Sequence, residues 1–174
     1  MKILTILNEG FEELEALGSL VTFKRASYQV DLVSETSVLK AKHLLTLSNL
    51  KSVEDINLDD YDLLFLPGGG YTPSKLTNEL ILYFYNNNKY IAAICSAPTS
   101  LGKLGLLKGR KYVCFPPMNE DFGGTFVDDY VVYDNKIFTA RSVAASMILP
   151  QVIIETIEGK EKLTELRKQM QYID

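Results

Sequence analysis

Residues 90–99 read YIAAICSAPT, and this stretch decides the fold. The mostly apolar run 90–94 has the length of a buried strand, and Pro98 is typical of the first turn of a helix. Cys95 therefore lies where a strand ends and a helix begins. Because a helix N-terminus stabilises negative charge, we expect the pKa of this thiol to lie below that of a free cysteine. The sequence predicts a nucleophile or an oxidation site at Cys95.

Strands and helices alternate outward from this stretch. Residues 2–7, 29–34 and 62–66 are short apolar runs, whereas residues 11–27 and 76–87 carry apolar side chains at helical spacing. This alternation is typical of an α/β protein with a doubly wound, mostly parallel sheet and helices on both faces. We also expect a short β excursion within 42–50, a helix from Pro98 to about Leu107 and a strand at 111–115. A hairpin with Asp134-Asn135 at its tip follows. The last expected elements are a helix over 143–158 and a polar C-terminal helix, which Gly159 separates.

Composition excludes several classes of protein. Hydrophobic residues make up 47% and charged residues 23% of the 174 residues, so we expect a single globular domain over 1–174. The net charge of -4 and the scattered Lys and Arg argue against a nucleic-acid partner. The N-terminal apolar run is broken at Asn8-Glu9-Gly10, too early for a membrane span or signal peptide, so no membrane partner is expected.

Two cysteines, Cys95 and Cys114, are too few for a disulfide framework and are typical of free thiols in a reducing cytoplasm. With one histidine, His43, and no Cys/His cluster, the chain lacks the usual ligands of structural zinc, so we predict no metal and no cofactor. Cys114 is expected to be a core thiol, and a resolving partner for Cys95 is the alternative.

Three chemically interesting segments follow predicted strands. Glu12, Glu13 and Glu15 come shortly after the first strand, a glycine-rich loop follows the strand at 62–66, and Cys95 follows the strand at 90–94. Because the carboxyl ends of parallel strands meet at one edge of the sheet, we expect these segments to form one site.

The residues of these segments resemble a known family. Residues 92–99 are similar to the nucleophile elbow of the ThiJ/PfpI superfamily, in the branch of the human parkinsonism-associated deglycase and bacterial YajL. Residues 66–69 look like the family's glycine loop, residues 12–15 like its acidic motif, and residues 138–142 match near the last helix. The resemblance implies a flavodoxin-like fold related to class I glutamine amidotransferases. It also implies a homodimer with Arg25 near the subunit interface.

The same resemblance assigns roles to residues. Cys95 matches the reactive cysteine and Glu15 the glutamate whose carboxyl group hydrogen-bonds the sulfur. Gly69 and Ser96 match the positions whose backbone N–H groups face the sulfur or a bound oxyanion. Gly68, Phe115 and Arg141 are further candidates around the site, and Arg141 could instead pair with a surface carboxylate.

One position departs from the family. Many relatives place a histidine where this chain has Phe115, and His43 does not replace it by motif. A Cys–His peptidase mechanism, which needs an imidazole beside the nucleophile, is therefore poorly supported.

Two functions stay open. One is a glyoxalase- or deglycase-like enzyme acting on methylglyoxal-type aldehydes or glycated adducts through Cys95 and Glu15. The other is an oxidative-stress-responsive redox or chaperone-like protein in which Cys95 is oxidised to a sulfinate without turnover.

Overall fold

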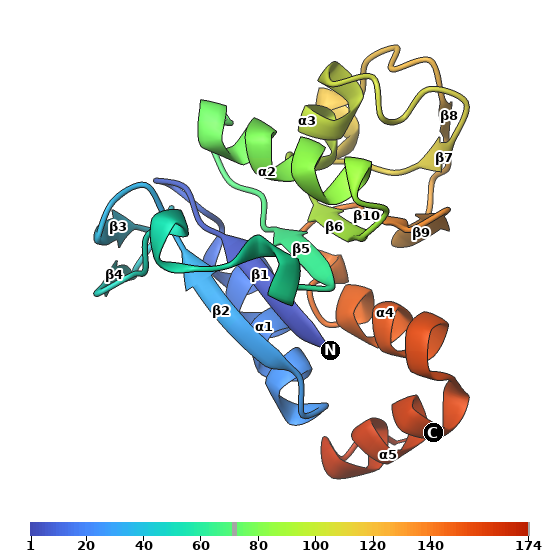
Figure 1. The fold of residues 1–174 in the computed structure, drawn as a ribbon. Helices are drawn as coiled ribbons and strands as arrows, with labels where there is room; N and C mark the ends of the chain where they lie inside the picture. The colour runs from blue at the N-terminus through green and yellow to red at the C-terminus, as the bar shows by residue number, and fades with distance from the viewer. Residues whose placement is uncertain (71–72, 174) are drawn as a thin grey trace.

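A six-stranded sheet forms the centre of the molecule (Figure 1). The computed structural model describes residues 1–70 and 73–173. The strand order is β2-β1-β5-β6-β10-β9, and β9 pairs antiparallel with β10 while the other pairings are parallel. The strands are β1 (Lys2–Ile6), β2 (Gln29–Val33), β5 (Leu63–Leu66), β6 (Tyr90–Ile94), β9 (Val131–Asp134) and β10 (Ile137–Ala140).

The buried central strands show why these runs form a parallel sheet. Every residue of β5 is buried, and residues 91–94 of β6 are fully buried, as expected for strands covered on both faces. The predicted hairpin joins β9 to β10, but its tip lies one residue later than predicted, because Asp134 still pairs with Ile137 as the last residue of β9. Asn135 and Lys136 at its tip have φ values of 43° and 68°, the left-handed pair that a tight two-residue turn requires.

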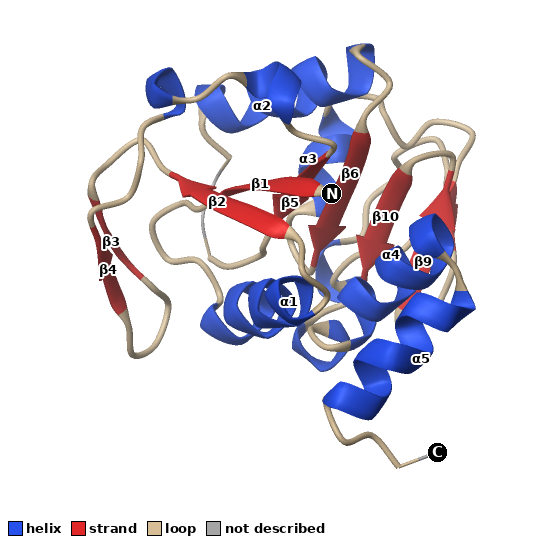
Figure 2. Cartoon of the chain, turned by 60° about the horizontal axis from the view of Figure 1, so that its bottom comes forward, coloured by secondary structure: helices blue, strands red, loops and turns tan. Residues whose placement is uncertain are grey.

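Helices cover both faces of the sheet (Figure 2). On one face lie α1 (Glu13–Arg25), α4 (Ile148–Glu158) and α5 (Lys160–Gln169), which share an apolar core with Ile3, Phe65 and Phe138. On the other face lie α2 (Lys75–Asn86) and α3 (Pro98–Lys103), packed on Leu4, Leu64 and Ile91. The predicted doubly wound α/β architecture is confirmed.

The helix after Cys95 is shorter than predicted. It ends at Lys103, because Gly105 adopts a left-handed φ of 76° and reverses the chain. The Leu106 N–H donates to the Leu101 carbonyl and the Gly105 N–H to the Gly102 carbonyl, which closes the helix C-terminus in a Schellman motif. Leu106 and Leu107 are buried after the helix rather than in it.

Other elements also differ from the prediction in length. The strand expected at 111–115 is shorter, β7 (Lys111–Tyr112), and it pairs with β8 (Thr125–Phe126) outside the main sheet. The strand ends there because the next backbone N–H, that of Val113, donates to the Thr139 side chain Oγ1 and not to a neighbouring strand. The last helix begins at Ile148 after a 3₁₀ turn, η4 (Val143–Ala145), because Ser142 is fully extended. The expected β excursion is a hairpin of β3 (Val38–Lys40) and β4 (Thr46–Ser48). Three further 3₁₀ turns are η1 (Val53–Asp55), η2 (Leu58–Asp60) and η3 (Pro116–Met118).

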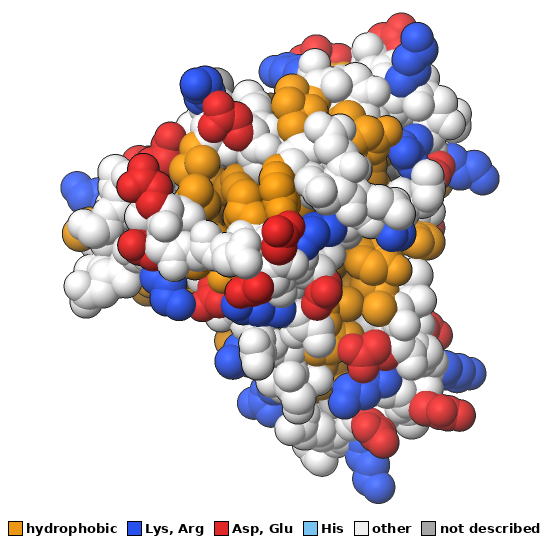
Figure 3. Space-filling model, viewed as in Figure 1, with side chains coloured by type: hydrophobic (Ala, Val, Ile, Leu, Met, Phe, Trp, Pro, Cys, Tyr) orange, Lys and Arg blue, Asp and Glu red, His pale blue; other side chains and the backbone are white. Residues whose placement is uncertain are grey.

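The surface carries both signs of charge. On the face drawn in Figure 3, acidic and basic side chains are interspersed, and the Lys and Arg side chains form no continuous positive region there. Among residues 1–70 and 73–173, no helix has the length and apolar character needed to cross a bilayer.

Candidate active site

Cys95 directly follows β6 and adopts an unusual backbone conformation. Its φ is 64°, a left-handed value that costs free energy in a residue other than glycine and is concentrated at functional sites. Hydrogen bonds on both sides hold this conformation. The Cys95 N–H donates to the Ala140 carbonyl at 2.9 Å, and the Phe115 N–H donates to the Cys95 carbonyl at 2.7 Å. These two hydrogen bonds hold the residue in place, and the half-buried thiol is still open to a small reagent.

Glu15 in the first turn of α1 brings a carboxyl group to this thiol. Its side chain is fully buried and hydrogen-bonds the Cys95 side chain. Oε2 accepts the Gly68 N–H at 2.9 Å. Oε1 is buried and has no partner with good hydrogen-bond geometry among the described residues.

Gly68 is the residue that allows this approach. A Cβ at position 68 would lie 2.6 Å from both Cys95 Cβ and Glu15 Oε2, and 2.9 Å from the Ile94 carbonyl oxygen. Real side chains do not tolerate such contacts. The glycine loop therefore lets its backbone lie against the thiol and the carboxyl together, as the Gly68 assignment to the site's surroundings predicted.

The thiol and the carboxyl titrate as a coupled pair. Burial raises the pKa of Glu15 to about 7, against hydrogen bonds from Cys95 and Gly68 that lower it. Burial also raises the pKa of Cys95 to about 12, and the Glu15 carboxylate adds to that rise. The predicted lowering of the thiol pKa is therefore wrong. The reason is that α3 is a six-residue helix beginning three residues after Cys95, too short and too distant to offset burial. Between the two steps the pair holds one proton in common.

Gly69 and Ser96 form a closed hydrogen-bonded contact. The Gly69 N–H donates to Ser96 Oγ at 3.1 Å, and the Ser96 hydroxyl donates to the Gly69 carbonyl at 3.0 Å. The Gly69 N–H thus donates to the serine and not to the sulfur. Its expected role toward a bound oxyanion stays a prediction. The Ser96 N–H, in contrast, is a hydrogen-bond donor to Cys95 that favours the thiolate.

Ser142 is a site residue that the sequence reasoning missed. Its hydroxyl lies 3.8 Å from the Cys95 sulfur, where it donates a hydrogen bond and lowers the thiol pKa. It follows β10, the strand beside β6, so the register of the two strands brings it to the thiol. Ser142 is the last residue of segment 138–142, and the resemblance of this segment to the family is the sequence signal that points to it.

Three other candidates take different places. Phe115 contacts Cys95 through its backbone, and its half-exposed ring supplies no proton-transfer group. Arg141 pairs with the exposed Asp128 carboxylate, the alternative foreseen for it. Cys114 is fully buried in the core beneath α3, and burial raises its pKa to about 11, so the expectation of a core thiol is confirmed.

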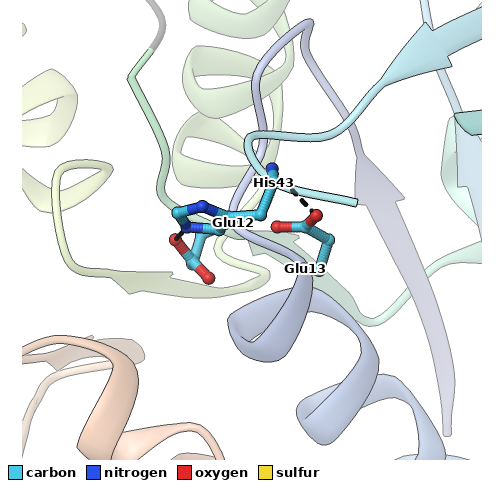
Figure 4. Close-up of side chains that lie close together, drawn as sticks. All are labelled: Glu12, Glu13 and His43. Carbon is cyan, nitrogen blue, oxygen red and sulfur yellow. Dashed lines mark hydrogen bonds and ion pairs between the residues drawn. The ribbon is translucent and has the colours of Figure 1, made fainter. Parts of the chain in front are cut away.

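A second polar cluster lies at the start of α1 (Figure 4). His43 Nε2 lies 3.2 Å from Glu12 Oε2, and Lys42 Nζ lies 3.6 Å from the same oxygen. Burial raises the pKa of Glu13, but backbone N–H donors of residues 44, 13, 43 and 45 outweigh it and hold the pKa at about 2. This cluster borders the site because the Glu12 N–H donates to the Gly68 carbonyl at 2.9 Å.

The family follows from a comparison of the whole chain with known proteins. The model of the DJ-1/PfpI family matches residues 1–156. The chain belongs to this family. Protein dj-1beta of Drosophila melanogaster is 29% identical over 175 residues, covering 95% of this chain and 94% of the relative. A deglycase of Thermococcus kodakarensis is 29% identical over 149 residues, covering 81% of this chain and 90% of the relative.

Solved structures support the DJ-1/PfpI assignment. The crystal structure of Drosophila DJ-1beta superposes with a TM-score of 0.88 at 28% identity, covering 99% of this chain and 98% of that one. An oxidised DJ-1 of Toxoplasma gondii superposes with the same TM-score at 25% identity, covering 99% of each chain. The flavodoxin-like fold implied by the resemblance is confirmed.

Proposed function

We propose that this DJ-1/PfpI protein is a glyoxalase- or deglycase-like enzyme that acts on small aldehydes such as methylglyoxal, or on their adducts, through Cys95 and Glu15. One observation carries the proposal. A half-buried thiol in a strained left-handed conformation lies against a buried carboxyl group whose pKa is raised to about 7. Such a carboxyl can accept and return a proton near neutral pH, which is what covalent carbonyl chemistry requires.

The proposed steps balance in atoms and charge. Glu15 as carboxylate takes the thiol proton while the Cys95 sulfur bonds to the aldehyde carbon, and the protonated Glu15 returns that proton to the carbonyl oxygen. The product is a thiohemiacetal. Glu15 then moves a proton from the former aldehyde carbon toward the neighbouring carbonyl, which gives an enediol and, after tautomerisation, a lactate thioester. Water cleaves the thioester to lactate and free Cys95, so no external oxidant is consumed.

The names of some relatives support a deglycase-like activity at the level of the family. Several matched archaeal proteins are named deglycases, among them those of Thermococcus kodakarensis, Pyrococcus abyssi and Pyrococcus furiosus. Each is between 28% and 29% identical to this chain over 149 residues. Each alignment covers 81% of the chain.

A turnover assay tests the proposal. We expect wild type to convert methylglyoxal to lactate, Cys95→Ser to abolish conversion, and Cys114→Ser, which alters the other thiol, to retain it. Removal of a covalent nucleophile is expected to cost at least about 10³-fold in rate. Equal turnover by wild type and Cys95→Ser would reject Cys95 as the nucleophile, and no turnover by either would reject the enzymatic role.

A second candidate function is peroxide sensing by oxidation of Cys95 to a sulfinate. The Ser142 hydroxyl donates to the sulfur, and the Glu15 carboxyl lies beside it. When Glu15 is protonated, both groups can donate hydrogen bonds to sulfinate oxygens. Two equivalents of peroxide would each transfer one oxygen to sulfur and leave as water. Peroxide-treated protein with a Cys95 sulfinate and no aldehyde turnover would favour this function.

We further propose that the protein is a homodimer. Leu17, Leu20 and Val21 of α1, together with Val30 and Leu32 of β2, line an open apolar groove of about 470 Å³ that Arg25 borders. Leu14 and Val21 on the same helix are 54% and 50% exposed. Exposed apolar surface of this extent favours association, and a two-fold dimer is the commonest form of it.

A further inference from the structure

Two acidic side chains at the start of α1 converge with the single histidine of the chain. Glu12 and Glu13 lie at the N-terminus of the helix, and His43 lies in the loop between β3 and β4. One potential ligand atom from each of the three residues lies within 4.8 Å of the other two. Figure 4 shows the His43 imidazole beside the Glu12 carboxylate and the Glu13 carboxylate beside the backbone nitrogen of His43.

One carboxylate oxygen of Glu13 holds the His43 loop in place, and the other has no hydrogen-bond partner among the described residues. Its Oε1 accepts the backbone N–H groups of His43 at 2.9 Å, of Leu44 and of Leu45, which fastens the loop to α1. Its Oε2 is buried and has no hydrogen-bond partner among the described residues, although the residue is only 9% exposed. A buried carboxylate oxygen without a partner is costly, and a cation is a group that can satisfy it.

We propose that Glu12, Glu13 and His43 bind a divalent transition-metal ion of the Zn²⁺ or Ni²⁺ class. The donor set decides the class, because an imidazole with two carboxylates suits these ions, whereas Mg²⁺ and Ca²⁺ prefer oxygen ligands throughout. The 3.2 Å between His43 Nε2 and Glu12 Oε2 is close to the separation of two ligands about 2 Å from one ion. The imidazole is 56% exposed, so an ion can enter from solvent.

Lys42 is the natural competitor for this ion. Its Nζ lies 3.6 Å from Glu12 Oε2 and already supplies one positive charge to the cluster. The lysine side chain is 49% exposed, so it can turn into solvent when an ion binds. A divalent ion would therefore replace a weak, solvent-screened ion pair with direct coordination.

The proposed ion lies beside the reactive thiol without belonging to its chemistry. Glu12 donates its N–H to the Gly68 carbonyl, and the Gly68 N–H donates to Glu15, so a single residue, Gly68, links the two clusters. Bound metal would cross-link the β3–β4 loop to α1 at the rim of the site. This inference does not depend on the proposed enzymatic function.

Because the chain has one histidine, the test can be made specific. Tag-free protein carrying Cys95→Ser, which removes the more accessible of the two thiols, is titrated with Zn²⁺ by calorimetry. The same protein is titrated with Ni²⁺ while the His43 ring signals are followed by NMR. We expect one equivalent of Zn²⁺ to bind and one equivalent of Ni²⁺ to broaden those signals. His43→Ala and Glu12→Gln should each weaken Zn²⁺ binding by about tenfold or more.

A variant that is expected to tighten Zn²⁺ binding separates loss of a ligand from loss of structure. Lys42→Met removes the competing ammonium group and should tighten Zn²⁺ binding several-fold, whereas Lys40→Met, on the exposed end of β3, should leave it unchanged. Sharp, unshifted His43 signals at one equivalent of Ni²⁺ would overturn the proposal. Zn²⁺ binding of equal affinity in the His43→Ala variant would overturn it as well.

Discussion

The Gly68 N–H donates a 2.9 Å hydrogen bond to Oε2 of Glu15, and this is the backbone donor that the buried carboxyl receives. Glu13, two residues earlier, receives several backbone N–H donors, and its pKa is held at about 2. Glu15 has fewer donors and full burial, and its pKa is raised to about 7. Two carboxyl groups on one helix turn are thereby given different tasks. Glu13 is a permanently ionised anchor, and Glu15 is a group that can exchange a proton.

The raised pKa of Glu15 predicts a pH-dependent stability. Below the ordinary carboxyl pKa of 4.5 both folded and unfolded states hold the proton, and between 4.5 and about 7 the folded state holds more protons than the unfolded state. The free energy of unfolding should therefore fall as pH rises through this window. Glu15→Gln removes the titrating group, so its stability relative to wild type should increase by roughly 2 kcal/mol between pH 5.5 and 8.5.

Urea unfolding at several pH values measures this difference. Glu79→Gln on the exposed face of α2 is the matched control, and its difference from wild type should not change with pH. A pH-independent difference between Glu15→Gln and wild type would show that Glu15 is ionised throughout, and the proton-transfer role would then fail.

Gly68→Ala should disable the site while leaving the fold intact. The added methyl group would meet Cys95 Cβ and Glu15 Oε2 at 2.6 Å, so either the thiol or the carboxyl must shift. We expect destabilisation of about 1–3 kcal/mol and a large loss of Cys95 alkylation rate. Gly70→Ala is the control in the same loop, because a Cβ there meets nothing within 4 Å. Equal alkylation rates in the two variants would contradict the close approach.

Cys95 should be oxidised before Cys114. Burial raises both thiol pKa values, to about 12 and about 11, so access and proton transfer decide the order rather than the thiolate fraction. Cys95 is half-buried beside a carboxyl that can take its proton, whereas Cys114 is fully buried. Mild peroxide followed by peptide mass spectrometry should find oxygen on the Cys95 peptide first. Earlier oxidation of the Cys114 peptide would refute the site.

The fold and the thiol–carboxyl pair could be predicted because they depend on local signals. The apolar run before Cys95, the glycines after β5 and the spacing of Glu15 can each be read within a few residues. The pKa of Cys95 could not be predicted from the sequence in this way, because it depends on burial by several elements. Ser142 and the Glu12–His43 pair were missed for a related reason. The place of Ser142 in the matched segment 138–142 marks it as a candidate, but its contact with Cys95 depends on the register of β10 against β6. Glu12 meets His43 through a loop contact 31 residues away, which no local pattern encodes.

Val21→Glu should disrupt the proposed dimer. The substitution places a charge in the apolar groove between α1 and β2, where a partner subunit would have to desolvate it. Light scattering coupled to size exclusion should show wild type at twice the 19.6 kDa chain mass and the variant at or near it. Leu82→Glu, on the other face of the molecule and 37% exposed, should stay dimeric. Wild type that elutes as a monomer at micromolar concentration would exclude the dimer.

Phe115 predicts that aldehyde turnover is slow and that a histidine there would accelerate it. The Phe115 N–H donates to the Cys95 carbonyl at 2.7 Å, so a side chain at this position is anchored next to the thiol, but a phenyl ring cannot exchange protons. Glu15 must then serve every proton transfer alone. A positioned acid–base group typically contributes on the order of 10²–10⁴-fold, so Phe115→His should raise kcat for lactate formation by at least about tenfold.

The gain expected of Phe115→His must come from position rather than from an added imidazole alone. Met118→His provides that comparison, because Met118 lies in η3, the 3₁₀ turn that directly follows Phe115. Met118 is 39% exposed, close to the 36% of Phe115. An imidazole at 118 lacks the anchor to the Cys95 carbonyl and should leave kcat unchanged. Combining Phe115→His with Cys95→Ser should return turnover to background, since the imidazole assists only a covalent intermediate. If wild type is already as fast as Phe115→His, another group beside the thiol supplies the proton, and Ser142, 3.8 Å from the sulfur, is the first side chain to replace.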